Sequence, residues 1–240
     1  MAEILLIETA TQVCSVGIAN SDGLLSLKED NGSNYAHSSS LTVFIEEALL
    51  AANLSFSSLS AVAISRGPGS YTGLRIGVAA AKGICYALDI PLIAVDTLEG
   101  LARQCAENLK SFDKTEAPRG LHVLLCPMID ARRMEVYCAL FDFHGKQILE
   151  TEALVVNSSS FLTYLESHKI LFFGNGAAKC ASVIQHPNAL FLDGIAPSAK
   201  GLVASAMNKF QMAAFEDIAY FEPFYLKDFV AGTPRVKGLN

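Results

Sequence analysis

Short uncharged apolar runs alternate along the chain with longer stretches in which apolar residues recur every three or four positions. A short, partly β-branched apolar run predicts a buried strand, and the spacing of three and four predicts a helix. The predicted strands are 4–7, 13–19, 24–27, 59–64, 92–95, 122–129, 135–141, 147–150, 170–173 and 190–192, and the predicted helices are 41–52, 73–88, 97–109, 159–167, 177–185 and 198–215.

Three meandering strands followed by alternating helices and strands occur twice in this order, separated by the polar segment 113–120. Such an order predicts an α/β protein built from a duplicated unit. We therefore expect one domain at 1–112 and a second at 113–240, with the last helix or the tail packing back on the first domain. The two halves show no repeat at the level of individual residues.

The stretch 66–88, RGPGSYTGLRIGVAAAKGICYAL, has the most unusual composition. A Gly-Pro-Gly turn precedes Ser70, which can cap a helix from Gly73 to Leu88. Only Arg75 and Lys82 are charged in that helix, so most of its faces must be covered. Its three internal glycines indicate that another backbone approaches closely. Either the chain's own sheet or a partner could provide this cover.

The overall composition excludes several classes of protein. A hydrophobic content of 51%, with mean hydropathy +0.35, indicates a globular chain with ample core, and a net charge of −6 argues against independent nucleic-acid binding. The six scattered cysteines are typical of reduced core residues. Glu3 and Glu8 flank a short apolar run at the start, and no stretch is long and apolar enough to span a bilayer. We expect a cytoplasmic protein without membrane contact.

Polar residues at the ends of corresponding strands suggest a cleft between the halves. Carboxylates there, such as Glu8, could hold Mg²⁺, and neighbouring hydroxyl and guanidinium groups could contact phosphates. The candidates for nucleotide binding are Thr9, Asp130, Arg132, Gly174 and Gly176. Ordinary turn chemistry explains Glu8 and the two glycines equally well, and we favour it for them. The glycine turn at residues 67–69 matches neither GxxxxGK[ST] nor GxGxxG.

Hydrolytic chemistry finds little support in the sequence. The five histidines stand alone, with no HExxH pair, and there is no GxSxG elbow. A zinc peptidase would therefore lack its ligands. We assign no catalytic residue and no metal ligand.

Six stretches carry a resemblance to a known family, namely IETATQVCSVGI, SRGPGSYTGLRIGVAAAKG, PLIAVDTLEGLA, MIDARRMEVYCALF, FFGNGA and PFYLKDF. Together they resemble the TsaB (YeaZ) family of glycoprotease-like relatives of the transferase TsaD, nearly from end to end. The resemblance implies two tandem actin-like (ribonuclease H-like, ASKHA superfamily) domains, the second reduced. It also implies a role in making threonylcarbamoyladenosine beside the tRNA anticodon.

The resemblance further implies a scaffold without catalytic activity of its own. Where TsaD carries two metal-binding histidines, this chain has Thr97 and Leu101, which cannot replace them. The helices at 41–54 and 73–88 would pair with the same two helices of TsaD, or of a second copy when TsaD is absent. The partner-binding candidates are Phe44, Glu47, Ser70, Tyr71, Leu74, Arg75, Val78 and Lys82. A bulky residue at Gly77 is expected to abolish the association.

The other expected partners follow from that complex. The ATPase TsaE and the tRNA would be reached only through TsaD, and ATP or ADP with Mg²⁺ would enter with the complex, since this chain requires no cofactor itself. Two alternatives stay open. One is a nucleotide-binding ATPase or kinase-like enzyme that uses Glu8 and Asp130 in the cleft, and the other is a metallopeptidase.

Overall fold

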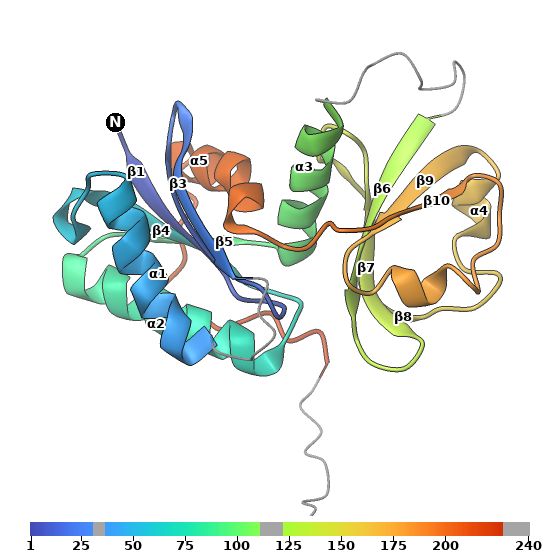
Figure 1. The fold of residues 1–240 in the computed structure, drawn as a ribbon, viewed down its shortest axis with the longest axis horizontal. Helices are drawn as coiled ribbons and strands as arrows, with labels where there is room; N and C mark the ends of the chain where they lie inside the picture. Colours follow the sequence, from blue (N-terminus) through green and yellow to red (C-terminus); the bar gives the residue numbers. More distant parts are fainter. Residues whose placement is uncertain (31–36, 111–121, 228–240) are drawn as a thin grey trace, which may run out of the picture.

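The computed structural model describes residues 1–30, 37–110 and 122–227, and in these ranges the chain forms two five-stranded sheets (Figure 1). The predicted boundary at 113–120 lies outside the described residues. In the first sheet the strand order is β3-β2-β1-β4-β5. Its strands are β1 (Glu3–Glu8), β2 (Cys14–Asn20), β3 (Gly23–Asp30), β4 (Leu59–Ser65) and β5 (Leu92–Val95).

The second sheet repeats this topology. Its strands are β6 (His122–Asp130), β7 (Glu135–Phe141), β8 (Gln147–Val155), β9 (His168–Phe173) and β10 (Ala189–Leu192). The order β8-β7-β6-β9-β10 matches that of the first sheet strand for strand, with an antiparallel meander on one side and parallel strands on the other. The duplication predicted from the element order is therefore present in the fold.

Two helices cover one face of the first sheet. α1 (His37–Ala51) packs on β2 and β3, and α2 (Tyr71–Leu88) packs on β4. Because side chains alternate along a strand, the residues of β1 that face these helices are Leu5 and Ile7. Ile4 and Leu6 face the opposite side of the sheet. The first sheet is thus buried on both faces, as a mostly apolar β1 requires.

The helices that cover each sheet do not all come from the same half of the chain as its strands. α3 (Thr97–Lys110) packs on β6 and β7 of the second sheet. The short helix η3 (Ala199–Leu202) and α5 (Val203–Gln211), near the end of the chain, cover the free face of the first sheet. Figure 1 shows α3 and α5 between the two sheets. Each sheet therefore depends on a helix that follows the other sheet in the sequence.

The helices of the second half are shorter than predicted. Only η2 (Ala178–Cys180) forms within the predicted helix 177–185, where Val183 and Ile184 are β-branched and the segment is too short to offset helix nucleation. The predicted helix 159–167 is reduced to α4 (Leu162–Leu165), because Phe161 before it has a left-handed φ of 65°.

Other boundaries also differ from those predicted. The predicted helix 198–215 begins as η3 and ends at Gln211, shortly before Ala213 takes a positive φ of 51°. The predicted strand 147–150 continues to Val155, paired with β7 along its length. The six cysteines are all buried and unpaired, as expected. No described helix is both long and apolar enough to cross a membrane.

The two halves meet where α3 crosses η3. Gly100 and Gly201 lie so close that a Cβ on Gly201 would overlap the carbonyl oxygen of Gly100. We expect Gly201→Ala to lower the free energy of unfolding by about 1–3 kcal/mol, because the two segments must separate to admit the methyl group. Urea denaturation would measure this loss. The neighbouring Lys200→Ala serves as a control, and equal stabilities of the two variants would contradict the close contact.

Candidate partner-binding face

α2 begins at a turn that the chain itself holds in place. The Ser70 hydroxyl accepts a hydrogen bond from the Gly73 amide at 3.3 Å and caps the helix. The Ser70 amide donates to the Ala10 carbonyl at 2.6 Å, which ties the turn to the end of β1. The predicted partner contact Ser70 is thus already used in forming the helix.

Two of the three internal glycines of α2 are required by the chain's own packing. A Cβ on Gly73 would overlap the Thr9 carbonyl oxygen, and a Cβ on Gly77 would overlap the Thr9 hydroxyl oxygen. Thr9 is fully buried, and its hydroxyl donates to the Gly73 carbonyl at 2.9 Å. The close backbone approach that the glycines predicted is therefore made by the loop after β1. A bulky residue at Gly77 would disturb the fold itself, so it cannot test partner binding.

Gly83 differs from the other two glycines. It is exposed, and a Cβ added there would meet nothing within 4 Å. It lies in a stripe of exposed residues spaced three and four apart along α2, which we call the α2 stripe: Thr72, Arg75, Ala79, Gly83 and Tyr86. The Tyr86 side chain is 84% exposed. The adjacent α1 exposes Val43 and Leu50, the latter to 77%.

The predicted partner-binding residues differ in their exposure. Leu74 and Val78 point into the core and are 0% and 5% exposed, so neither side chain can contact a partner on this surface. Phe44 is partly buried against the same core, and Glu47 is exposed on α1, 3.3 Å from Lys28. The sequence analysis missed Gly83 and Tyr86, although their spacing along α2, opposite the buried positions, could have indicated them.

The remaining three candidates contact the C-terminal part of the chain. The Tyr71 ring lies 4.9 Å from the Tyr225 ring, and Arg75 donates to the Tyr225 hydroxyl at 3.1 Å. Lys82 donates to the Phe221 carbonyl at 3.0 Å. Arg75 remains exposed despite this contact, so it belongs both to the α2 stripe and to the contact with the chain end.

The five nucleotide candidates are not brought together. Thr9 is buried beneath α2, whereas the other four lie at the end of β6 in the second half. There Asp130 pairs with Lys179, and its carboxylate accepts a hydrogen bond from the Arg132 amide at 3.0 Å. A Cβ on Gly174 or on Gly176 would collide with the β6 backbone. Packing thus accounts for both glycines, in agreement with the turn interpretation.

Comparison with known proteins identifies the family. A protein-family model described as TsaD: tRNA N6-adenosine threonylcarbamoyltransferase matches residues 32–237. A relative from Escherichia coli (strain K12), the "tRNA threonylcarbamoyladenosine biosynthesis protein TsaB", is 29% identical over 237 residues, which cover 95% of this chain and 96% of the relative. A "tRNA N6-adenosine threonylcarbamoyltransferase" from Bacillus thuringiensis (strain Al Hakam) is 45% identical over 64 residues, 27% of this chain and 19% of that protein.

The chain belongs to the TsaB (YeaZ) branch of this family. Among solved structures, a Pseudomonas aeruginosa protein described as similar to peptidase YEAZ superposes with a TM-score of 0.78 at 23% sequence identity, covering 95% of this chain and 100% of that one. This likeness and the repeated sheet order confirm the predicted fold of two tandem actin-like domains. The short helices of the second half agree with its expected reduction.

In this TsaB-family chain, Thr97 and Leu101 stand where the resemblance places the metal-binding histidines of TsaD. Both residues are part of the core. Leu101 is 1% exposed and packs between α3 and the second sheet. Thr97 is fully buried, its hydroxyl accepts a hydrogen bond from the Gly67 amide at 3.2 Å, and it lies 3.2 Å from the Ser65 hydroxyl. Both side chains therefore have structural roles.

The same buried network contains Glu8. Its carboxylate accepts hydrogen bonds from the Ala10 amide at 2.7 Å and the Ser65 hydroxyl at 3.0 Å. Burial raises the pKa of the Glu8 carboxyl from its ordinary value of 4.5 to about 7, because the two hydrogen bonds only partly offset the loss of water. With 1% exposure, Glu8 is enclosed in the core of the first half and does not line a cleft.

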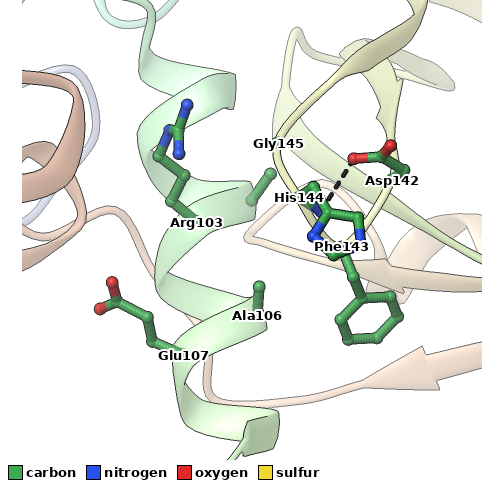
Figure 2. Close-up of a pocket in the computed structure, with 8 residues that line it drawn as sticks. Arg103, Ala106, Glu107, Asp142, Phe143, His144 and Gly145 are labelled. Carbon is green, nitrogen blue, oxygen red and sulfur yellow. Dashed lines mark hydrogen bonds between the residues drawn. The ribbon is translucent and has the colours of Figure 1, made fainter. Parts of the chain in front are cut away.

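A separate hollow of about 180 Å³ lies between α3 and the turn after β7 (Figure 2). Arg103 from α3 reaches toward this turn, but its guanidinium already pairs with Glu99 at 2.9 Å. The Asp142 carboxylate accepts the His144 amide hydrogen bond at 2.8 Å, which shapes the turn. The hollow contains none of the residues predicted from the sequence, so we do not assign it to the functional site.

Glu8 predicts a specific dependence of stability on pH. Between pH 4.5 and about 7 the folded chain retains a proton that the unfolded chain has lost, so stability falls as the pH rises through this window and is level above it. Glu8→Gln keeps an accepting oxygen and cannot ionise. We expect the variant to gain roughly 2–3 kcal/mol relative to the parent between pH 4.5 and pH 8. Urea denaturation across this range would measure the gain.

Glu166→Gln, at an exposed carboxylate of the second half, is the matched control and should show no such gain. Parallel stability curves for Glu8→Gln and the parent protein would contradict the raised pKa.

The glycines of α2 predict alanine substitutions of opposite sign. Gly83→Ala should stabilise the chain by up to about 1 kcal/mol, because the new methyl group meets no atom and alanine favours the helix. Gly77→Ala should destabilise it by about 1–3 kcal/mol, because the Thr9 hydroxyl must move and give up its hydrogen bond. Thermal unfolding of both variants would test this pair, and a gain for Gly77→Ala would refute the packing explanation.

Proposed function

We propose that this chain is a non-catalytic subunit in tRNA threonylcarbamoyladenosine biosynthesis, and that it binds the transferase TsaD through α1 and the α2 stripe. Its membership of the TsaB branch and the name of its Escherichia coli relative support this pathway. The partner is chosen because the family model that matches most of the chain is that of TsaD.

Gly83 carries the proposal. Gly73 and Gly77 are accounted for by Thr9, whereas Gly83 weakens the helix by about 1 kcal/mol although a Cβ there would meet no other part of the described chain within 4 Å. A glycine flanked on the same stripe by Ala79 allows a partner helix to approach closely. The loss of helix stability at Gly83 is explained if a partner covers this surface in a complex.

The side chains around Gly83 supply apolar area for such a contact. Leu50 and Tyr86 are 77% and 84% exposed, and Val43 is 47% exposed. Burying a side chain of this size contributes about 1.5–3 kcal/mol, so a few of them suffice for a stable interface core. The aromatic ring of Tyr86 is of the kind that dominates the binding energy in many interfaces.

The scaffold role is supported by the residues at the family's metal-binding positions. Thr97 and Leu101 are buried in structural contacts, and neither side chain is a ligand for a transition metal in this chemistry. We infer that TsaD supplies the catalytic groups. With a net charge of −6, this chain would meet tRNA through its partners, and the ATPase TsaE would likewise join through TsaD.

Light-scattering chromatography of the chain alone and mixed with its TsaD tests the proposal. We expect a one-to-one complex with TsaD, and a self-dimer through the same face when TsaD is absent. Gly83→Trp and Leu50→Glu should each weaken the association by at least about tenfold, because one blocks close approach and the other buries a charge.

Val155→Glu is the matched control for Leu50→Glu. Val155 is 63% exposed on β8 of the other half, so its replacement should leave the affinity unchanged. Gly83→Ala controls for the loss of glycine without added bulk. If the chain ignores TsaD, or if Gly83→Trp binds as well as the parent, the proposal is refuted.

A further inference from the structure

After α5 the chain returns along α2 through residues 216–227, which contain a turn at 218–220 and which we call the strap. The Glu216 amide donates to the Leu92 carbonyl at 2.9 Å, which anchors the start of the strap to β5. Lys82 on α2 donates to the Ala219 and Phe221 carbonyls at 3.3 and 3.0 Å. Phe221 is 9% exposed and packs into the core beneath α1 and α2.

The middle of the strap is fixed to the turn before α2. The Phe224 amide donates to the Arg66 carbonyl at 2.7 Å. A Cβ on Gly67 would lie 2.6 Å from the Phe224 carbonyl oxygen, so a glycine at this position is required by the strap. The Arg66 guanidinium lies 5.8 Å from the centre of the Phe224 ring and pairs with Asp96 at 2.8 Å.

The last residues of the strap lead from α2 to the second sheet. The Tyr225 ring packs on Tyr71, and its hydroxyl accepts the hydrogen bond from Arg75. Two residues later, Lys227 pairs with Glu135, the first residue of β7. Since one residue advances the backbone by at most about 3.6 Å, the backbone between these two contacts is short, and only the Lys227 side chain can lengthen the connection.

We infer that the strap couples the first turns of α2 to the orientation of the second sheet. Near the end of the strap, Tyr225 contacts α2 and Lys227 contacts β7, and the residues before them hold the rest of the strap to β5, α2 and the turn before α2. Movement of β7 relative to the first half must therefore stretch the strap or release one of these contacts. A change in the angle between the two sheets would therefore tighten or loosen the contacts of the strap with the start of α2.

The coupling concerns the proposed docking face directly, and this part of the inference rests on the proposed function. A hollow of about 250 Å³ lies between α2 and the strap, lined by Arg75, Val78, Ala79, Lys82, Glu222, Pro223 and Tyr225. Arg75 and Ala79 also belong to the α2 stripe. A partner bound to the α2 stripe would thus also contact the strap. The affinity of the chain for that partner would then depend on the strap keeping its contacts with α2 and β7.

Hydrogen exchange of the unliganded chain, followed by mass spectrometry, tests the coupling without any partner. Lys227→Ala removes only the attachment to β7. We expect exchange to become about fivefold faster not only near Lys227 but also in peptides that cover the first turns of α2, because the strap loosens along its length. Tyr225→Ala should in turn speed exchange at the start of β7.

Tyr220→Ala is the matched control, since Tyr220 lies in the strap and is 85% exposed. It should leave exchange at α2 and β7 unchanged. If Lys227→Ala and Tyr225→Ala alter only their own neighbourhoods, the two attachments are independent and the inference is overturned.

Binding to TsaD separates this inference from the proposed function. We expect Lys227→Ala to weaken the association by about threefold to tenfold, although Glu135 and Lys227 lie outside the α2 stripe. If the parent protein fails to bind TsaD, the proposed function fails, but the exchange result still decides the coupling. If the parent protein binds and Lys227→Ala binds equally well, the strap has no influence on docking and that part of the inference is wrong.

Discussion

The contact between the loop after β1 and the first half of α2 determines much of the remaining structure. Thr9 approaches the helix so closely that a Cβ at position 73 or 77 would overlap its oxygen atoms, and three hydrogen bonds of the loop and the helix start lie in this small region. Because interiors are densely packed, such an approach fixes both the position and the rotation of the helix. The rotation in turn decides which residues of α2 point outward.

This constraint explains why a nearly apolar helix has one face in the core and another exposed. Leu74, Val78 and Ala81 face the sheet because Gly77 beside them faces Thr9. The stripe through Ala79, Gly83 and Tyr86 is then left on the outside by geometry alone. The same helix thus serves as a core element and presents an uncovered small-residue surface, and the two explanations of its composition are compatible.

The strands could be predicted from the sequence, because short uncharged apolar runs and turn residues are local signals. The strand at 92–95 and that at 135–141 coincide with β5 and β7. Side-chain roles within α2 could not be predicted in this way. Leu74 and Val78 were expected to contact a partner, and their burial depends on how α2 packs against the distant Thr9 and the sheet.

The role of the residues at the candidate cleft could not be predicted from the sequence either, for a different reason. A ligand site could use a carboxylate such as Asp130 and small residues such as Gly174 and Gly176. In the structure Asp130 pairs with Lys179, and the two glycines lie against the β6 backbone. Whether a glycine admits a ligand or a neighbouring strand depends on the register between β6 and β9, which the local sequence does not encode. The prediction of a helix at 177–185 was wrong for a related reason. Its buried residues Ala177, Cys180 and Ile184 can be placed in the core by turns as well as by a helix.

The exchange of layers between the halves links the fold to the proposed partner surface. α3 completes the second sheet and α5 completes the first, so neither sheet keeps its full core when the halves separate. The contact at Gly100 and Gly201 is close and sterically demanding. A rotation of the two halves about this contact would leave α3 on the second sheet and α5 on the first. The strap is attached to α2 and to β7 on either side of that contact. Any such rotation therefore changes the strap, which lies along the helix that we propose a partner binds.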